Sequence, residues 1–127
     1  MHTYSGGCHC AAVRFEIDVE GVLEVEDCNC SICRKTGYLH LIRPLAAFRL
    51  LSGAELLSEY RFNTGVAVHR FCRVCGVKPF YVPRSNPDGI DINVRCLDRP
   101  WPPMRLVPFD GENWEAHAAA LAHKSET

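Results

Sequence analysis

Apolar and polar residues alternate along much of the chain. In residues 13–19 every second residue is Val, Phe or Ile, and the residues between them are charged. Residues 23–25 alternate in the same way and lead directly into Cys28, and residues 60–62 and 90–94 repeat the pattern. Because a period of two is typical of strands with one buried face, the pattern predicts a largely β structure.

Shorter apolar runs, turn residues and one helical segment complete this prediction. Further runs that suit strands lie at 39–42, 48–51 and 80–82, and turn residues lie at 52–53, 63–65 and 85–89. Residues 114–124 have helical spacing, with Trp114 and Leu121 on one face. Asp110 or Asn113 is placed to cap the start of that helix, and residues 56–57 suit a single helical turn.

Length and charge exclude several classes of protein. A chain of 127 residues predicts one domain, over residues 1–127. The net charge of −1 argues against a nucleic-acid partner, because general nucleic-acid binders carry a clear basic excess. The first residues lack the basic and apolar regions of a secretory signal, and no apolar run approaches the roughly 18 residues of a membrane span. We therefore expect a cytoplasmic protein without a membrane partner.

The eight cysteines carry the chemical signal. In a reducing compartment, cysteines at this density more often bind metal or do chemistry than form disulfides. All but Cys96 fall in three clusters. These are Cys8-His9-Cys10, Cys28-Asn29-Cys30-Ser31-Ile32-Cys33 and Cys72-Arg73-Val74-Cys75.

The first and last clusters predict one closed metal site. A Cys-x-x-Cys turn lets Cys72 and Cys75 approach one ion, and Gly76 supplies the tight backbone that such turns favour. In an extended segment Cys8 and Cys10 share a face, so they can complete a structural zinc site that contributes strongly to folding. The alternatives are ordinary buried cysteines, or a redox dithiol at Cys72 and Cys75.

The middle cluster predicts a second, open site. Cys28 and Cys30 share a face, and the turn after them brings Cys33 round, so three thiolates leave one tetrahedral position free. Three protein ligands with an exchangeable fourth are typical of catalytic zinc. The alternative is a closed site with Cys96 or Asp98 as the fourth ligand. An iron site is a further alternative, because thiolates also suit that metal.

Two basic residues follow the middle cluster directly. Arg34 and Lys35 would offset its negative charge, help to keep the thiols ionised, and contact a carboxylate of a bound ligand. The alternative is a solvated pair on the surface.

These motifs identify a family. The chain resembles the glutathione-dependent formaldehyde-activating enzyme family, and within it the branch that contains centromere protein V. The resemblance covers nearly the whole chain in the right order. It rests on Gly-Gly-Cys-His-Cys at 6–10, Cys-Asn-Cys-Ser-Ile-Cys-Arg-Lys at 28–35 and Phe-Cys-Arg-Val-Cys-Gly at 71–76, and it continues through 83–87, 96–98 and 109–115.

The resemblance implies a fold, two metal sites and an activity. The fold is a mainly β, Mss4-like β-tent of short antiparallel strands with a C-terminal helix. By the resemblance one zinc ion is structural and a second lies at the active site, with ligands that agree with the spacing. The structural set is Cys8, Cys10, Cys72 and Cys75, and the catalytic set is Cys28, Cys30 and Cys33. The implied activity is that of a carbon–sulfur lyase, the formation or cleavage of S-hydroxymethylglutathione from glutathione and formaldehyde.

Three functions from different classes follow. In the first, a glutathione-type thiol loses its proton at the open zinc, and Arg34 or Lys35 anchors its carboxylate while a small aldehyde is positioned beside the sulfur. In the second, the same site binds or carries the thiol without accelerating its reaction with the aldehyde. In the third, both zinc sites are closed, and the protein is a structural or interaction module.

The remaining candidate residues have simpler explanations. No metal spacing places the histidines at 2, 40, 69, 117 and 123, and His9 points away from its cysteine neighbours. We therefore expect ordinary surface or core histidines, with His69 as the one whose position brings it nearest a site. Cys96 is predicted to be a small buried residue, with a place beside the second zinc as the alternative.

Overall fold

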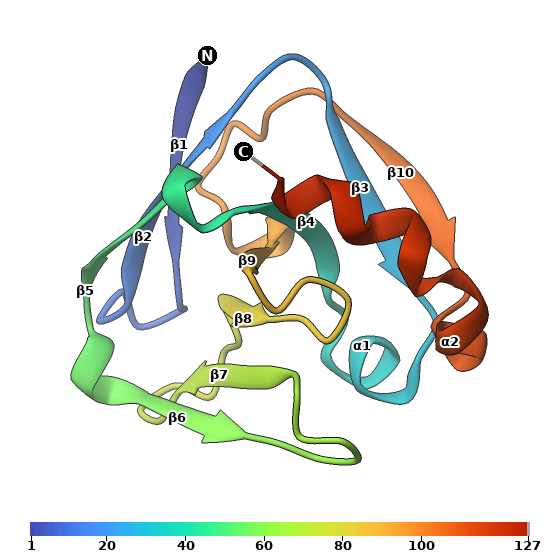
Figure 1. Ribbon diagram of the computed structural model, residues 1–127. Coiled ribbons are helices and arrows are strands. Elements are labelled where there is room, and N and C mark those ends of the chain that lie inside the picture. Colours follow the sequence, from blue (N-terminus) through green and yellow to red (C-terminus); the bar gives the residue numbers. More distant parts are fainter. Residues whose placement is uncertain (127) are drawn as a thin grey trace.

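Two β-sheets form the framework of the computed structural model, which describes residues 1–126 (Figure 1). The smaller sheet has the order β1-β2-β5, with β1 at His2–Gly7, β2 at Arg14–Val19 and β5 at Phe48–Ser52. The larger sheet has the order β10-β3-β4-β9-β8-β7-β6. Its strands are β10 (Met104–Phe109), β3 (Leu23–Cys28), β4 (Leu39–Pro44), β9 (Gly89–Asn93), β8 (Phe80–Val82), β7 (Val68–Cys72) and β6 (Leu57–Tyr60).

Short helices connect and cover these strands. Helix α1 (Ser31–Thr36) follows β3, and helix α2 (Trp114–His117) continues as a 3₁₀ segment over Ala118–Ser125. That C-terminal segment packs against β4 and β9 of the larger sheet. Single 3₁₀ turns occur at Leu45–Ala47, Ala54–Leu56, Val94–Cys96 and Gly111–Asn113.

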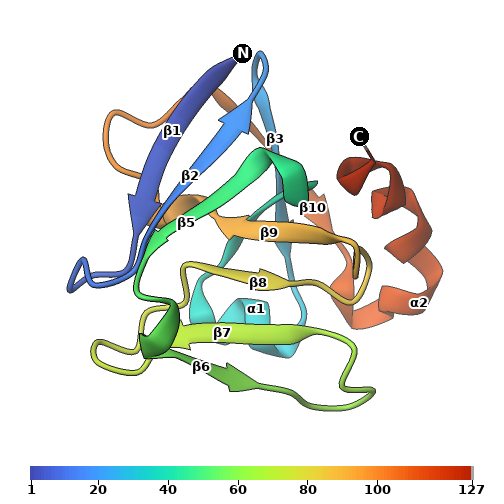
Figure 2. The ribbon, with the colours of Figure 1, turned by 60° about the vertical axis from the view of Figure 1, so that its left-hand side comes forward.

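The core lies between the two sheets, which face each other in Figure 2. On β2, Phe15 and Ile17 are fully buried, while the charged residues between them are partly exposed. The Phe15 ring meets the Phe80 ring of the larger sheet edge to face, with centroids 6.0 Å apart. The alternating pattern at 13–19 therefore predicts the inner face of this sheet correctly, because each inward side chain removes apolar surface from water.

Most of the predicted elements are confirmed, and several details are wrong. The mainly β class, the strands at 39–42, 48–51, 80–82 and 90–94, and the C-terminal helical region are all present. However, β10 pairs with β3 in parallel, so the strands are not all antiparallel. The strand expected at 60–62 instead spans 57–60. Strands β1, β7 and β10 and helix α1 were not predicted.

The two predicted cap residues take N-cap positions at the start of the C-terminal helical region, Asp110 before the 3₁₀ turn and Asn113 before α2, but without a capping hydrogen bond. Instead, the Asn113 amide donates to the Asp110 carboxylate at 2.7 Å. None of the helices in the described residues has both the length and the apolar character needed to cross a membrane.

Asn86 attaches the C-terminal segment to the body of the protein. Its side chain is 1% exposed, and its amide nitrogen donates to Leu121 O at 2.9 Å, to Ala122 O at 3.2 Å and to Ser125 Oγ at 3.0 Å. These bonds supply partners for backbone groups at the end of a helical segment, where the intrahelical pattern stops.

We predict that Asn86→Ala destabilises the protein by about 1–3 kcal/mol, because buried acceptors lose their partner. Amide hydrogen exchange should accelerate most over residues 114–125. Denaturant unfolding and exchange measured by mass spectrometry test both effects, with the exposed Glu55→Ala as the control. Equal exchange rates in wild type and Asn86→Ala would show that the segment is held by other contacts.

Candidate metal centres

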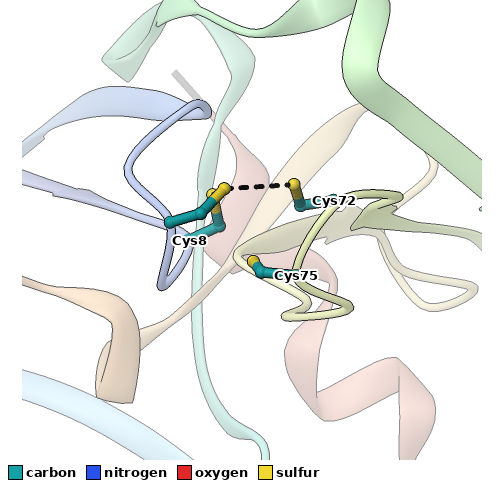
Figure 3. Close-up of side chains that lie close together, drawn as sticks. Cys8, Cys72 and Cys75 are labelled. Carbon is teal, nitrogen blue, oxygen red and sulfur yellow. Dashed lines mark hydrogen bonds between the residues drawn. The ribbon is translucent and has the colours of Figure 1, made fainter.

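The first and last cysteine clusters meet at one point between the two sheets. The sulfur atoms of Cys8, Cys10, Cys72 and Cys75 all lie within 4.8 Å of one another. Cys10 is 3.6 Å from Cys8 and 3.7 Å from Cys72, sulfur to sulfur. In Figure 3 the labelled sulfurs of Cys8, Cys72 and Cys75 face a common space.

Two turns present these sulfurs, and one of them differs from expectation. Cys8 and Cys10 lie in a turn rather than an extended segment, closed by a hydrogen bond from Cys8 N to Val13 O at 3.1 Å. The Val13 N–H also donates to the Cys8 sulfur at 3.3 Å. The second turn fits the prediction, because Gly76 has φ 79° and its N–H donates to Cys72 O at 2.7 Å.

The three thiols of the middle cluster come from adjacent elements. Cys28 ends β3, Cys30 is the N-cap of α1, and Cys33 is buried inside that helix. The three thiols hydrogen-bond to one another. Cys28 and Cys33 donate to the Cys30 sulfur, which lowers the pKa of Cys30 and raises the pKa of Cys28 and of Cys33. The cluster can therefore carry thiolate charge, which a metal ion would stabilise.

A histidine that was not predicted completes this second cluster. The Nε2 atom of His40, on β4, lies 3.0 Å from the Cys33 sulfur, and the ligand atoms of Cys28, Cys33 and His40 lie within 4.8 Å of one another. His40 Nδ1 lies 2.6 Å from Asp91 Oδ2 on β9. A carboxylate behind the far nitrogen is the usual second shell of a metal-binding histidine, because it fixes the tautomer and orients the ring.

The two alternative fourth ligands lie elsewhere. The Asp98 carboxylate forms an ion pair with Arg14 and is half exposed. The sulfur of Cys96 contacts Lys78 O at 3.8 Å, and its pKa is raised to about 12 by burial and by the charges of Cys8 and Cys75. The backbone of Cys96 lies against Gly6, two residues before Cys8. Neither Cys96 nor Asp98 belongs to the group formed by Cys28, Cys33 and His40, so the structure does not support the alternative of a second site closed by one of them.

The second cluster opens into a cavity of about 800 Å³. This volume falls within the range of pockets for small ligands, about 300–1,000 Å³. The opposite walls come from the 62–67 loop, the 83–85 loop and the start of the C-terminal helical region. Arg34 lines the cavity, whereas the exposed Lys35 is not among its lining residues. Arg84 also lines it and stacks on the Trp114 ring at 3.8 Å.

The segment after β10 is packed directly onto the second cluster. Asn29 holds it there: the Asn29 side chain donates to Asp110 Oδ1 at 3.1 Å and accepts the Glu112 N–H at 2.9 Å. As a result Gly111 lies so close that a Cβ built on it would be 2.3 Å from the Cys28 sulfur and 2.9 Å from Cys30 Cβ. No residue with a side chain fits at 111 without displacing the cluster.

Comparisons with known proteins identify the family. A family model described as glutathione-dependent formaldehyde-activating enzyme matches residues 3–115, and the chain belongs to that family. It is 31% identical over 111 residues to a Halomonas elongata protein with the provisional name glutathione-dependent formaldehyde-activating enzyme, covering 80% of this chain and 71% of that protein.

A solved structure supports the fold. A crystal structure of a Rhodobacter sphaeroides protein is 35% identical, with a TM-score of 0.70, and the match covers 80% of this chain and 99% of that chain. The family and the fold class are therefore established. The likeness to the centromere protein V branch stays a prediction from the sequence motifs.

We predict that Gly111→Ala weakens metal binding at the second cluster and leaves the first cluster intact. The added methyl group collides with the Cys28 sulfur, whereas the first four cysteines are in a different part of the fold. Metal content per chain, measured by atomic emission after dialysis, should fall by one equivalent while far-UV circular dichroism is retained. Gly65→Ala is the control for loss of a glycine as such: its φ of 73° makes alanine strained, but nothing lies within 4 Å of its Cβ position, so it should keep its metal. Full metal content in Gly111→Ala would contradict the prediction.

Proposed function

We propose that the protein is a zinc-dependent carbon–sulfur lyase that forms or cleaves S-hydroxymethylglutathione. The observation that carries the proposal is the second cluster, in which Cys28, Cys33 and His40 have their ligand atoms within 4.8 Å of one another. Together with Cys30 they line a cavity large enough for a peptide-sized thiol. Family membership supports glutathione and formaldehyde as the substrates. The chain would act as a single zinc-binding domain in the cytoplasm.

The two clusters suit two zinc ions with different roles. Cys8, Cys10, Cys72 and Cys75 would hold a structural ion, since four sulfurs within reach of one point match a closed tetrahedral site. The second ion would be held by Cys28, Cys30 and Cys33, where its chemistry is to favour the thiolate form of a bound thiol.

The protein's own residues handle the proton of the incoming thiol. Because Asp91 accepts the hydrogen bond from His40 Nδ1, the lone pair of His40 lies on Nε2, toward the second cluster. His40 Nε2 therefore accepts a thiol proton, and Asp91 stabilises the resulting imidazolium. A sulfur–carbon bond then forms as the carbonyl π bond breaks, and the proton ends on the new hydroxyl oxygen, so no oxidant or reductant is needed.

Arginines on the cavity wall suit the carboxylates of glutathione. Arg34 and Arg84 both line the cavity, and a guanidinium binds a carboxylate with two parallel hydrogen bonds. Lys35, the other predicted contact, is less well placed because it lies outside the cavity lining. We therefore assign the anchoring role to Arg34 first.

A second candidate function rests on His40. If His40 Nε2 is the fourth metal ligand beside the three cysteines, the site is closed to an incoming thiol. The protein would then bind glutathione without catalysis, or serve as a structural interaction module. The 3.0 Å contact between Nε2 and Cys33 is the observation that favours this candidate.

We predict that the zinc-loaded protein accelerates exchange between formaldehyde, glutathione and their adduct. Magnetisation-exchange NMR on the three species measures the rate directly. Cys33→Ser should abolish the acceleration, because Cys33 belongs to the second cluster and touches His40. Cys96→Ser, whose sulfur lies outside the second cluster, should behave as wild type.

The same experiment separates the competing functions. An unchanged exchange rate with broadened glutathione signals would establish a thiol carrier, and no change in either would rule out both glutathione functions. The zinc content of Cys30→Ser distinguishes the two possible ligand sets of the second site. If this variant loses one ion, the ligands are Cys28, Cys30 and Cys33. If it keeps both ions, the ligands are Cys28, Cys33 and His40.

We predict that Arg34→Ala raises the dissociation constant of glutathione about tenfold, the effect of removing a charge-assisted hydrogen bond. Lys35→Ala is the matched neighbour and should leave binding unchanged. Calorimetric titration of the zinc-loaded variants measures both constants. Equal weakening by the two substitutions would indicate a general charge effect rather than a contact inside the cavity.

A further inference from the structure

His69 is a buried histidine on the cavity wall that the mechanism above does not use. It lies on β7, is 4% exposed and lines the same cavity as the second cluster. Tyr81 connects it to the second cluster, since the Tyr81 ring stacks on His69 and the Tyr81 hydroxyl lies 3.3 Å from His40 Nδ1. Its Nε2 atom is shielded from solvent and has no hydrogen-bond partner among the described residues. A buried polar atom without a partner requires an explanation, since such atoms are costly.

Aromatic rings hold the imidazole on both faces. The Tyr81 ring is nearly parallel to it, with centroids 4.7 Å apart and an interplanar angle of 10°. The Phe62 ring stacks on it at 5.3 Å, and Phe62 comes from the loop that forms one cavity wall. With its faces covered, the ring can make polar contacts only at its edge, through its two nitrogens.

Lys78 occupies one of those nitrogens and determines the tautomer. Its Nζ lies 2.6 Å from His69 Nδ1 and 3.9 Å from the centre of the Tyr81 ring. An ammonium group only donates hydrogen bonds, so Nδ1 must carry the lone pair, and the proton of a neutral imidazole must be on Nε2. Burial, together with the charge of Lys78, lowers the pKa of His69 to about 4, so the ring is neutral near pH 7.

We propose that His69 Nε2–H donates a hydrogen bond to the oxygen of the aldehyde and of the hydroxymethyl adduct, as a catalytic residue, with Lys78 as the positioning residue behind it. This inference rests on the proposed function. As the sulfur–carbon bond forms, the carbonyl π electrons move to oxygen, and Nε2–H stabilises the charge that develops there. In the reverse direction the same contact binds the hydroxyl group of the adduct.

The energetic argument is that of a preorganised donor. A donor fixed by stacking and by a buried ammonium does not reorient during the reaction, and it is shielded from the water that would compete for it. Neutral imidazole also stabilises an oxyanion without transferring its proton outright. The proposed hydrogen bond to the substrate oxygen thus explains both why Nε2 has no partner in the protein and why Lys78 is buried against Nδ1.

The first test is kinetic and uses the zinc-loaded protein with glutathione and formaldehyde. His69→Phe keeps the stacking but removes both nitrogens, and the exchange rate at saturation should fall about 100-fold, as on removal of an oxyanion donor. The dissociation constant of glutathione alone should not change. His69→Gln, whose amide nitrogen lies near the position of Nε2, should restore part of the rate, and the exposed His123→Phe should match wild type. A wild-type rate in a folded His69→Phe protein would overturn the inference while leaving the proposed function standing.

The second test does not depend on turnover. In ¹⁵N-histidine-labelled protein, His69 should show a protonated Nε2 and an unprotonated Nδ1, and Lys78→Met should mix the tautomers. The equilibrium mixture that contains S-hydroxymethylglutathione should shift the Nε2 signal, whereas S-methylglutathione, which lacks the hydroxyl, should not. If the wild type does not accelerate exchange, the proposed function fails, and this shift still decides the role of His69. A proton on Nδ1, or equal shifts with both ligands, would overturn the inference.

Discussion

The convergence of four sulfur atoms between the two sheets is the constraint on which the rest of the structure depends. Cys8 and Cys10 follow a strand of the smaller sheet, and Cys72 and Cys75 follow a strand of the larger one. Neutral thiols hydrogen-bond weakly, and four thiolates in contact would repel one another. Four sulfurs within 4.8 Å of one another form an arrangement that a cation between them would stabilise. Such an ion would supply a cross-link between sheets that the chain brings together only on folding.

The second cluster depends on this framework because its groups come from separate strands of the larger sheet. β3 delivers Cys28, β4 delivers His40, and β9 delivers Asp91 behind it. β10 pairs with β3 in parallel, which brings the Gly111 backbone against the cysteine sulfurs. Asp91 and His40 are almost completely buried, and such groups are tolerated in a core only when they are paired. Because His40 also contacts the Cys33 sulfur, the pair ties the position of Cys33 to the register between β4 and β9.

The sequence predicts what short-range patterns can determine and misses what the strand pairing brings together. Alternation at 13–19 identifies the buried face of β2, and the cysteine spacing brings together Cys8 with Cys10, Cys72 with Cys75 and Cys28 with Cys33, because these patterns depend on neighbours along the chain. The position of Cys96 against Gly6 depends instead on a turn far along the chain. His40 and Asp91 belong to strands that pair only through the fold, although charged residues within the apolar runs at 39–42 and 90–94 were a signal of buried chemistry.

In the proposed reaction the two buried histidines of the cavity have opposite roles, because groups of opposite charge lie behind them. The carboxylate of Asp91 accepts from His40 Nδ1 and leaves a lone pair on Nε2, so His40 is an acceptor of protons. The ammonium of Lys78 donates to His69 Nδ1 and leaves a proton on Nε2, so His69 is a donor of hydrogen bonds. Addition of a thiol to an aldehyde needs both functions, one at sulfur and one at oxygen. A single buried charge behind each ring determines which function it serves, and exchanging the two partners would reverse the polarity of the site.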